Sequence, residues 1–362
     1  MSGTMQWRLT VLAGLLAAVL GCAFPLHAQR APLPLGTINK KAVNQLASCP
    51  AGYYPGMTCY QGKVESCPNT DSLGFTYGYE NPVGGILGTI VMFEGGGGTT
   101  PYKNSAFAQK YLQSGYQVVY VAWNSDWEFT NKNRGTSIKY AACRPATFLS
   151  YIYQNRYLGG GMCAQGFSAG SAAVGYSLAW YGSASFLDNV ELLSGPVFSD
   201  IEQGCVVPHS SKVTVCDAGQ FGCNGAEWPD GPAYVGGDQT AVGTWSGQPS
   251  CNNGRTTTSL ANSTWKQMSI VDGTVNPSFS YPQTAMSGWL CSNVNVVQND
   301  TAAQGNFFYQ QFTNSRQTAS FSVGRVDHCA GPEGVPEGTT PQGVLGLVAI
   351  SDSMLSSCVR RH

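Results

Sequence analysis

One segment of the sequence, residues 161–175, limits the possible folds more than any other. It contains a Gly-x-Ser-x-Gly match at residues 166–170, with Ser168 at its centre. A short apolar run at residues 162–165 precedes the match, as in a buried strand, and an alanine-rich stretch with helical spacing follows it. A strand, a sharp turn and a helix in this order predict a nucleophile elbow, with the serine side chain exposed at the carboxyl end of the strand.

The five-residue match carries little weight by itself. The sequence has 45 glycines among 362 residues, so a bare match arises easily by chance. The flanks strengthen the prediction, because Gly166 and Gly170 would let strand and helix backbones approach closely. Ala172 and Ala173 would let the helix lie tight against a sheet.

Strand and helix signals alternate along most of the chain. Apolar runs at residues 86–93 and 116–122 are typical of central strands that are covered on both faces. Other strands are expected at residues 58–65, 74–80, 190–193, 294–298 and 319–323, and helices at 102–113, 137–157, 171–180, 306–312 and 341–357. This alternation predicts an α/β fold with a mostly parallel central sheet and helices on both faces.

The alternation stops at residues 196–288. This stretch has four cysteines, three tryptophans and many glycine, asparagine and proline residues. A compact domain rarely contains so long a loop, so we expect a cap inserted over the sheet edge. The predicted organisation is a signal peptide at residues 1–28, a core in two parts at 29–195 and 289–362, and the cap between them.

The amino terminus has the pattern of an export signal. Arg8 precedes an apolar run at residues 9–24, and Ala28 offers a small residue before a cleavage site. The run is too short for a membrane span, so a secreted or periplasmic protein is expected. Lipoprotein anchoring through Cys22 is the alternative, although Leu20 is bulky for such a site. A net charge of −1 shows no excess of basic residues, so nucleic-acid binding is not expected.

Cysteine usage agrees with export. The sequence has 13 cysteines, and removal of Cys22 with the signal leaves 12, an even number that indicates disulfides. Cys49, Cys59 and Cys67 are expected to brace the first strands. A Cys291–Cys329 bond is expected if the loops that carry these residues lie side by side. No cysteine spacing resembles a metal site, and no cofactor is expected.

A catalytic serine needs a base, and histidine is scarce in this chain. His328 follows the last predicted strand, so its loop should reach the same sheet edge as Ser168. His209 lies in the predicted cap and His362 is the final residue, so neither is favoured. We therefore predict His328 as the general base.

The base needs an acid that orients it. Asp300 follows the strand expected at residues 294–298, and Asp200 follows the strand expected at residues 190–193. Asp300 is preferred and Asp200 remains the alternative, while Asp327 is too close to His328 in the sequence to face it. The order Ser168, Asp300, His328 is the order described for nucleophile-elbow enzymes.

Backbone amides are expected to stabilise an oxyanion. Gly96, Gly97 and Gly98 follow the strand at residues 86–93, and glycine presents N–H groups without side-chain obstruction. Ala169, directly after the serine, supplies another predicted donor. Trp123, Trp127 and Phe167 are candidate substrate contacts, although tryptophans of this kind also serve as ordinary core residues.

With these motifs in place, the chain resembles the α/β-hydrolase superfamily from about residue 58 to the carboxyl terminus. Its secreted serine esterases and lipases have a comparable glycine-rich motif, in which Glu94 here replaces the usual histidine. The resemblance implies a cap-bearing hydrolase fold and cleavage of small or polymeric carboxylic esters through an acyl-enzyme. A peptidase, an acyltransferase or a non-catalytic binding protein on the same fold remains open.

Overall fold

A computed structural model describes residues 31–128, 138–199, 201, 267–271, 279–291, 304–305, 307–312, 318–326, 329–330, 335–336 and 341–362. The contacts divide the chain into Met1–Ala31 and Pro32–His362, and the description below concerns the second unit.

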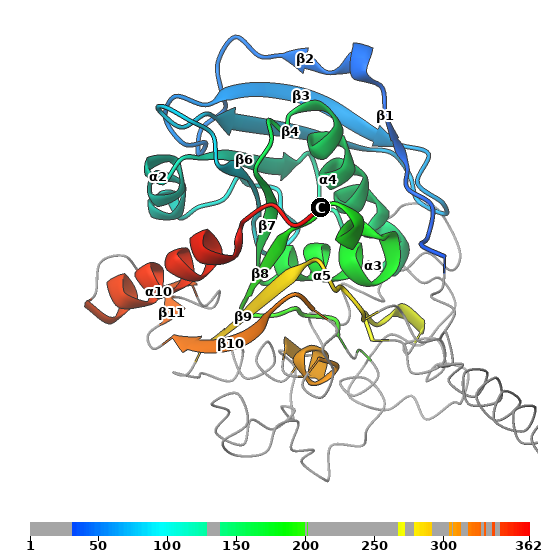
Figure 1. The fold of residues 1–362 in the computed structure, drawn as a ribbon. Coiled ribbons are helices and arrows are strands. Elements are labelled where there is room, and N and C mark those ends of the chain that lie inside the picture. Colours follow the sequence, from blue (N-terminus) through cyan, green and yellow to red (C-terminus); the bar gives the residue numbers. More distant parts are fainter. Residues whose placement is uncertain are drawn as a thin grey trace, which may run out of the picture. The chain divides into compact units, whose positions relative to one another are not determined.

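A ten-stranded sheet forms the centre of this unit (Figure 1). Its main path runs β1-β3-β4-β6-β5-β7-β8-β9-β10, and β2 pairs with β3 at the side. The strands are β1 (Thr37–Ile38), β2 (Asn44–Gln45), β3 (Thr58–Glu65), β4 (Leu73–Glu80), β5 (Gly88–Phe93), β6 (Tyr116–Trp123), β7 (Gly161–Phe167), β8 (Asn189–Leu193), β9 (Ala285–Cys291) and β10 (Phe321–Val326).

Strand pairing changes once along the sheet, from antiparallel to parallel. Neighbouring strands from β6 to β10 are all parallel, whereas β1, β2, β3 and β4 pair antiparallel, and β4 joins β6 antiparallel. The carboxyl ends of the parallel strands therefore share one edge. The prediction of a mostly parallel sheet is confirmed.

Helices cover both faces of the sheet (Figure 1). The helices α3 (Ile138–Ala141), α4 (Cys143–Asn155) and α5 (Ala169–Tyr181) pack on one face, where their apolar residues form one hydrophobic core. The helices α2 (Ser105–Gln113) and α10 (Pro341–Ser357) contact each other on the opposite face and enclose a second core. The central strand β5 is buried throughout because helices cover it from both sides.

One strand of the sheet was not predicted from the sequence. β9 (Ala285–Cys291) lies between β8 and β10, while the strand predicted at residues 294–298 lies outside the described residues. The first four residues of β9 belong to the range expected for the cap. Ser287 and Gly288 interrupt the apolar run, which hides the strand signal.

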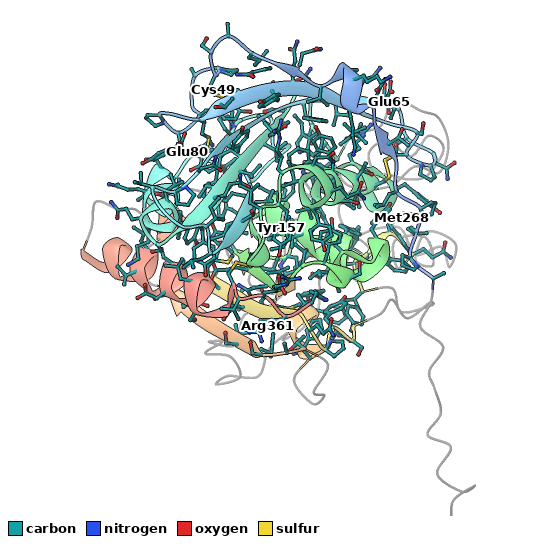
Figure 2. The ribbon with its side chains drawn as sticks, turned by 45° about the horizontal axis from the view of Figure 1, so that its top comes forward. Cys49, Glu65, Glu80, Tyr157, Met268 and Arg361 are labelled. Atoms are coloured by element: carbon teal, nitrogen blue, oxygen red, sulfur yellow. A yellow bond between two sulfur atoms is a disulfide. The ribbon has the colours of Figure 1, made fainter. Side chains whose placement is uncertain are left out.

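One described segment of the predicted cap, residues 267–271, packs against α5. The Tyr176 hydroxyl donates to the carbonyl oxygen of Met268 at 2.6 Å, and the Trp180 indole N–H donates to that of Ile270 at 3.0 Å. Met268 is labelled in Figure 2. Ile270 is fully buried. Residues 202–266 lie outside the described part of the chain, so the cap stays a prediction.

Three disulfides join described residues. Cys49–Cys59 and Cys67–Cys143 fasten the first strands, as expected, and Cys163–Cys358 ties β7 to the residue after α10. The side chains of the expected Cys291–Cys329 bond lie outside the described ones. Among the described helices, none is long and apolar enough to cross a membrane.

Candidate active site

Ser168 occupies a sharp turn between β7 and α5. Its φ and ψ are 53° and −119°, a backbone conformation that L-residues adopt only when the surroundings enforce it. Every other residue from Gly161 to Tyr181 is buried, whereas Ser168 is partly exposed. The turn therefore brings the serine out of an otherwise buried strand and helix, as the elbow prediction requires.

Two glycines make this turn possible. A Cβ atom on Gly166 would lie 2.3 Å from the carbonyl oxygen of Gly170. A Cβ atom on Gly170 would lie 2.3 Å from the carbonyl oxygen of Phe93, at the end of β5. Both distances are too short for real contacts, so only glycine fits at either position.

Hydrogen bonds hold the Ser168 backbone from two sides. Its N–H donates to the carbonyl oxygen of Leu193, at the end of β8, at 2.9 Å. Its own carbonyl oxygen accepts from the N–H groups of Ser171 at 2.9 Å and Ala172 at 3.2 Å. Within the described residues, no acceptor takes the N–H of Ala169, which begins α5 and is the predicted oxyanion donor.

The glycine-rich loop after β5 lies against the elbow. A Cβ atom on Gly95 would be 3.0 Å from the Cβ of Ser168. The Gly98 N–H donates to the Gly95 carbonyl oxygen at 3.3 Å, so this amide closes a turn and is not available to a ligand. Gly96 and Gly97 donate to no acceptor among the described residues. They remain the candidate oxyanion donors from this loop.

Glu94 anchors the start of the loop. Its Oε1 accepts from the Gly95 N–H at 3.0 Å, and its Oε2 accepts from the Lys103 N–H at 2.7 Å. Sequence reasoning identified Glu94 only as a departure from the usual histidine. The hydrogen bonds explain what the glutamate does there.

The loop after β6 supports the glycines from the other side. The N–H groups of Trp123 and Trp127 donate to the carbonyl oxygens of Gly98 at 2.8 Å and Gly97 at 3.0 Å. The Asp126 carboxylate is packed against Gly97, and burial raises the pKa of Asp126. No pattern in the sequence identified this contact.

Arg144 fixes the same loop from α4. It is almost fully buried and donates to the carbonyl oxygen of Trp127 at 2.9 Å and to the Asp71 carboxylate at 3.0 Å. The neighbouring Glu128 is buried, and burial raises its pKa well above the ordinary value, with a smaller contribution from Asp126.

The three candidate substrate contacts are core residues in this structure. Trp123, Trp127 and Phe167 are 3%, 1% and 0% exposed. The Trp123 ring packs edge-on against Phe75 and Phe148, which ties the loop region to the main core. Their observed contacts are with the protein, so any effect on a substrate would be transmitted through the loops that they support.

His328, Asp300 and the alternative Asp200 lie outside the described residues. The strands before the first two are described, and both run parallel to β7 and β8. β10 ends at Val326, two residues before His328, and β9 ends at Cys291, nine residues before Asp300. Both strands end at the sheet edge where Ser168 lies, and the contacts of the triad remain a prediction.

Among the described residues, no group of three or more His, Cys, Asp or Glu side chains could hold a metal ion.

Known proteins resemble this chain in structure and not in sequence. No protein-family model and no curated protein matches it. An acetyl xylan esterase from Paenibacillus sp. R4 has a TM-score of 0.51 and 13% identity, over 94% of this chain and 93% of that one. A bacterial heroin esterase has a TM-score of 0.50 and 9% identity, over 86% and 87% of the two chains.

These two likenesses, together with the strand order and the elbow, define the class of protein: the chain has the α/β-hydrolase fold. At such low identities the likeness extends to the fold alone. An esterase from Pyrobaculum calidifontis, with a TM-score of 0.47 and 14% identity over 83% of this chain and 86% of that one, is a more distant structural match.

Proposed function

We propose that the protein is a serine hydrolase that cleaves carboxylic esters through an acyl-enzyme. Ser168 attacks the ester carbonyl, His328 takes the serine proton and returns it to the leaving alcohol, and Asp300 orients the imidazole. Water then attacks the acyl-enzyme, with His328 again acting as base. The reaction needs no metal or organic cofactor.

One observation supports this proposal above the others. Ser168 is the partly exposed residue of a buried strand-turn-helix, and the Gly95 backbone packs against it. Two loop amides, Gly96 and Gly97, and the Ala169 amide have no acceptor among the described residues. Amides of this kind beside a nucleophile are suited to a tetrahedral oxyanion.

An ester substrate is favoured over an amide. The glycine-rich loop resembles that of esterases and lipases, and the two structural neighbours compared above, with TM-scores of 0.50 and 0.51, are named as esterases. A peptidase or an acyltransferase would use the same groups with another acyl acceptor. A non-catalytic binding protein would have no need for the positive φ of 53° that exposes Ser168.

A substrate panel tests the proposal. It contains p-nitrophenyl esters of increasing chain length, an acetylated sugar, a feruloyl ester and a peptide. We expect turnover of esters by the wild type and its loss in Ser168→Ala. Peptide cleavage without ester turnover would indicate a peptidase, and no turnover of any substrate would indicate a binding protein.

We also propose that the protein acts outside the cytoplasm, as secreted or periplasmic. The three disulfides support an oxidising compartment, and residues 1–28 have the pattern of a signal peptide. Amino-terminal sequencing of the exported protein should begin at Gln29. A mature chain that begins with a lipidated Cys22 would instead support the anchored alternative.

A further inference from the structure

Glu94 connects two elements that border the candidate site. It follows β5 directly, and its side chain is 4% exposed. One carboxylate oxygen accepts from Gly95 at 3.0 Å, and the other accepts from Lys103 at 2.7 Å. Lys103 precedes Asn104, the capping residue of α2, so the carboxylate joins the end of β5 to the start of α2.

The two hydrogen bonds close the glycine-rich loop at its base. Hydrogen bonds to an ionised acceptor are stronger than those between neutral groups, and both donors here are backbone groups with fixed directions. With the Gly95 amide bound to Glu94 and the Gly98 amide bound within the turn, Gly96 and Gly97 carry the remaining loop amides. The carboxylate thus determines which amides of the loop stay available.

The backbone of Glu94 also contacts the elbow. A Cβ atom on Gly170 would lie 2.7 Å from the Glu94 carbonyl oxygen, and Gly95 packs on the Ser168 Cβ. A shift of Glu94 would therefore move the loop relative to the nucleophile. A carboxylate is a poor direct partner for an oxyanion because both are negative, so any role must be exerted through the backbone.

We propose that Glu94 is the positioning residue of the oxyanion hole. Its carboxylate holds the loop so that the Gly96 and Gly97 amides are directed at the carbonyl oxygen of a substrate bound to Ser168. This inference rests on the proposed ester hydrolysis and adds to it the group that aligns the donors. The usual histidine of the motif is replaced by an acid that binds two amides at once.

The test compares Glu94→Ala and Glu94→Gln with wild type. In Glu94→Gln, the amide oxygen can accept one N–H, but its NH2 group faces the other donor, so the loop is half anchored. For p-nitrophenyl acetate we expect kcat to fall about 100-fold in Glu94→Ala, the scale of losing one oxyanion donor, and less in Glu94→Gln. KM should change little in either variant.

Binding of a trifluoromethyl ketone supplies a readout that general loosening would not reproduce. This probe forms a tetrahedral adduct with an active serine, so its affinity should fall by the same factor as kcat. Thr89→Val is the matched control, because Thr89 is a buried residue of the same strand whose hydroxyl donates to Gln117 at 3.1 Å. It should lose thermal stability while kcat and ketone affinity stay at the wild-type values.

The outcomes separate the two proposals. If wild type cleaves esters and Ser168→Ala does not, ester hydrolysis stands whatever happens at Glu94. Unchanged kcat in folded Glu94→Ala, a loss confined to KM, or an equal loss of kcat in Thr89→Val would then overturn the role of Glu94. If Glu94→Ala does not fold, the isosteric Glu94→Gln decides, and wild-type kcat and ketone affinity in that variant would reject the proposal.

Discussion

The proposed role of Asp300, to orient His328, is a residue-scale assignment with a direct test. An Asp→Asn change keeps the shape of the side chain but removes the charge that selects the imidazole tautomer and stabilises its protonated form. We expect Asp300→Asn to lower kcat about 10⁴-fold on p-nitrophenyl acetate, and Asp200→Asn to change it little. The opposite pattern would transfer the role to Asp200.

A second residue-scale prediction concerns Glu191, a fully buried carboxyl group in β8. It accepts hydrogen bonds from Gln165 at 2.7 Å, Trp289 at 3.0 Å and Ser287 at 3.3 Å. Burial raises the pKa of Glu191 to about 8, although these hydrogen bonds oppose the shift. The folded protein thus holds a proton that the unfolded chain releases above about pH 4.3.

Because the folded state binds more protons, the free energy of unfolding should fall as pH rises between about 4.3 and 8, and then level off. Glu191→Gln cannot titrate, so its unfolding free energy should lose this part of the pH dependence. Urea unfolding at several pH values measures the difference. Glu65→Gln, at a partly exposed glutamate that pairs with Lys63, is the control and should follow the wild type. Parallel curves for wild type and Glu191→Gln would contradict the prediction.

At the scale of elements, the elbow depends on how closely α5 approaches β5. In Gly170→Ala, the new Cβ would meet two backbone carbonyl oxygens, at 2.3 and 2.7 Å, and neither can move without shifting a strand. We expect a loss of about 3 kcal/mol in unfolding free energy, the upper range for overpacking. Ester turnover should fall as well, because Ser168 moves with the helix.

Gly85→Ala is the matched control for that change. A Cβ atom there meets nothing within 4 Å, and the residue does not have a positive φ. Chemical denaturation should find its stability within about 0.5 kcal/mol of wild type. Similar stability losses in the two variants would show that close packing at the elbow is not what requires glycine.

The elements that the sequence predicted best are those with long apolar runs or a strong local motif. The strands at Gly88–Phe93 and Tyr116–Trp123, the helix at Pro341–Ser357 and the elbow itself appear close to where they were expected. β9 was not predicted because Ser287 and Gly288 break its apolar pattern, although Ser287 is buried and its hydroxyl donates to Glu191. Burial of a polar residue depends on its tertiary partner, which the local pattern does not contain.

The candidate site was likewise predicted in its local motifs and not in its tertiary contacts. The elbow serine and the candidate oxyanion loop were predicted from short-range motifs. The distinction among loop amides was not, because the loss of Gly98 as a donor depends on its turn with Gly95. Trp123 and Trp127 were predicted as substrate contacts but are buried in the core. The local sequence does not distinguish a tryptophan that lines a site from one that packs in the core.

At the scale of the whole unit, Cys163–Cys358 closes the longest loop among the described disulfides. It spans 195 residues, whereas Cys49–Cys59 spans 10. The chain-entropy model gives about 5 kcal/mol for a loop of the first size and about 3 kcal/mol for one of the second. Replacing both cysteines of a pair by alanine should therefore lower the melting temperature more for Cys163–Cys358.

Differential scanning calorimetry of the two double variants measures this order. Both should still turn over esters at 25 °C, because neither bond contacts Ser168. A larger loss for the Cys49–Cys59 pair would contradict the loop-length argument and would point to local packing as the main contribution of these bonds.

The central claim is that Ser168 is an activated nucleophile, and covalent labelling tests it most directly. After exposure to a fluorophosphonate, intact-mass measurement of the wild type should show one added phosphonyl group, and peptide mapping should assign it to Ser168. Ser168→Ala and His328→Ala should remain unlabelled under the same conditions, because one lacks the nucleophile and the other the base. Wild-type protein that stays unlabelled, or that carries the group on another residue, would contradict the account.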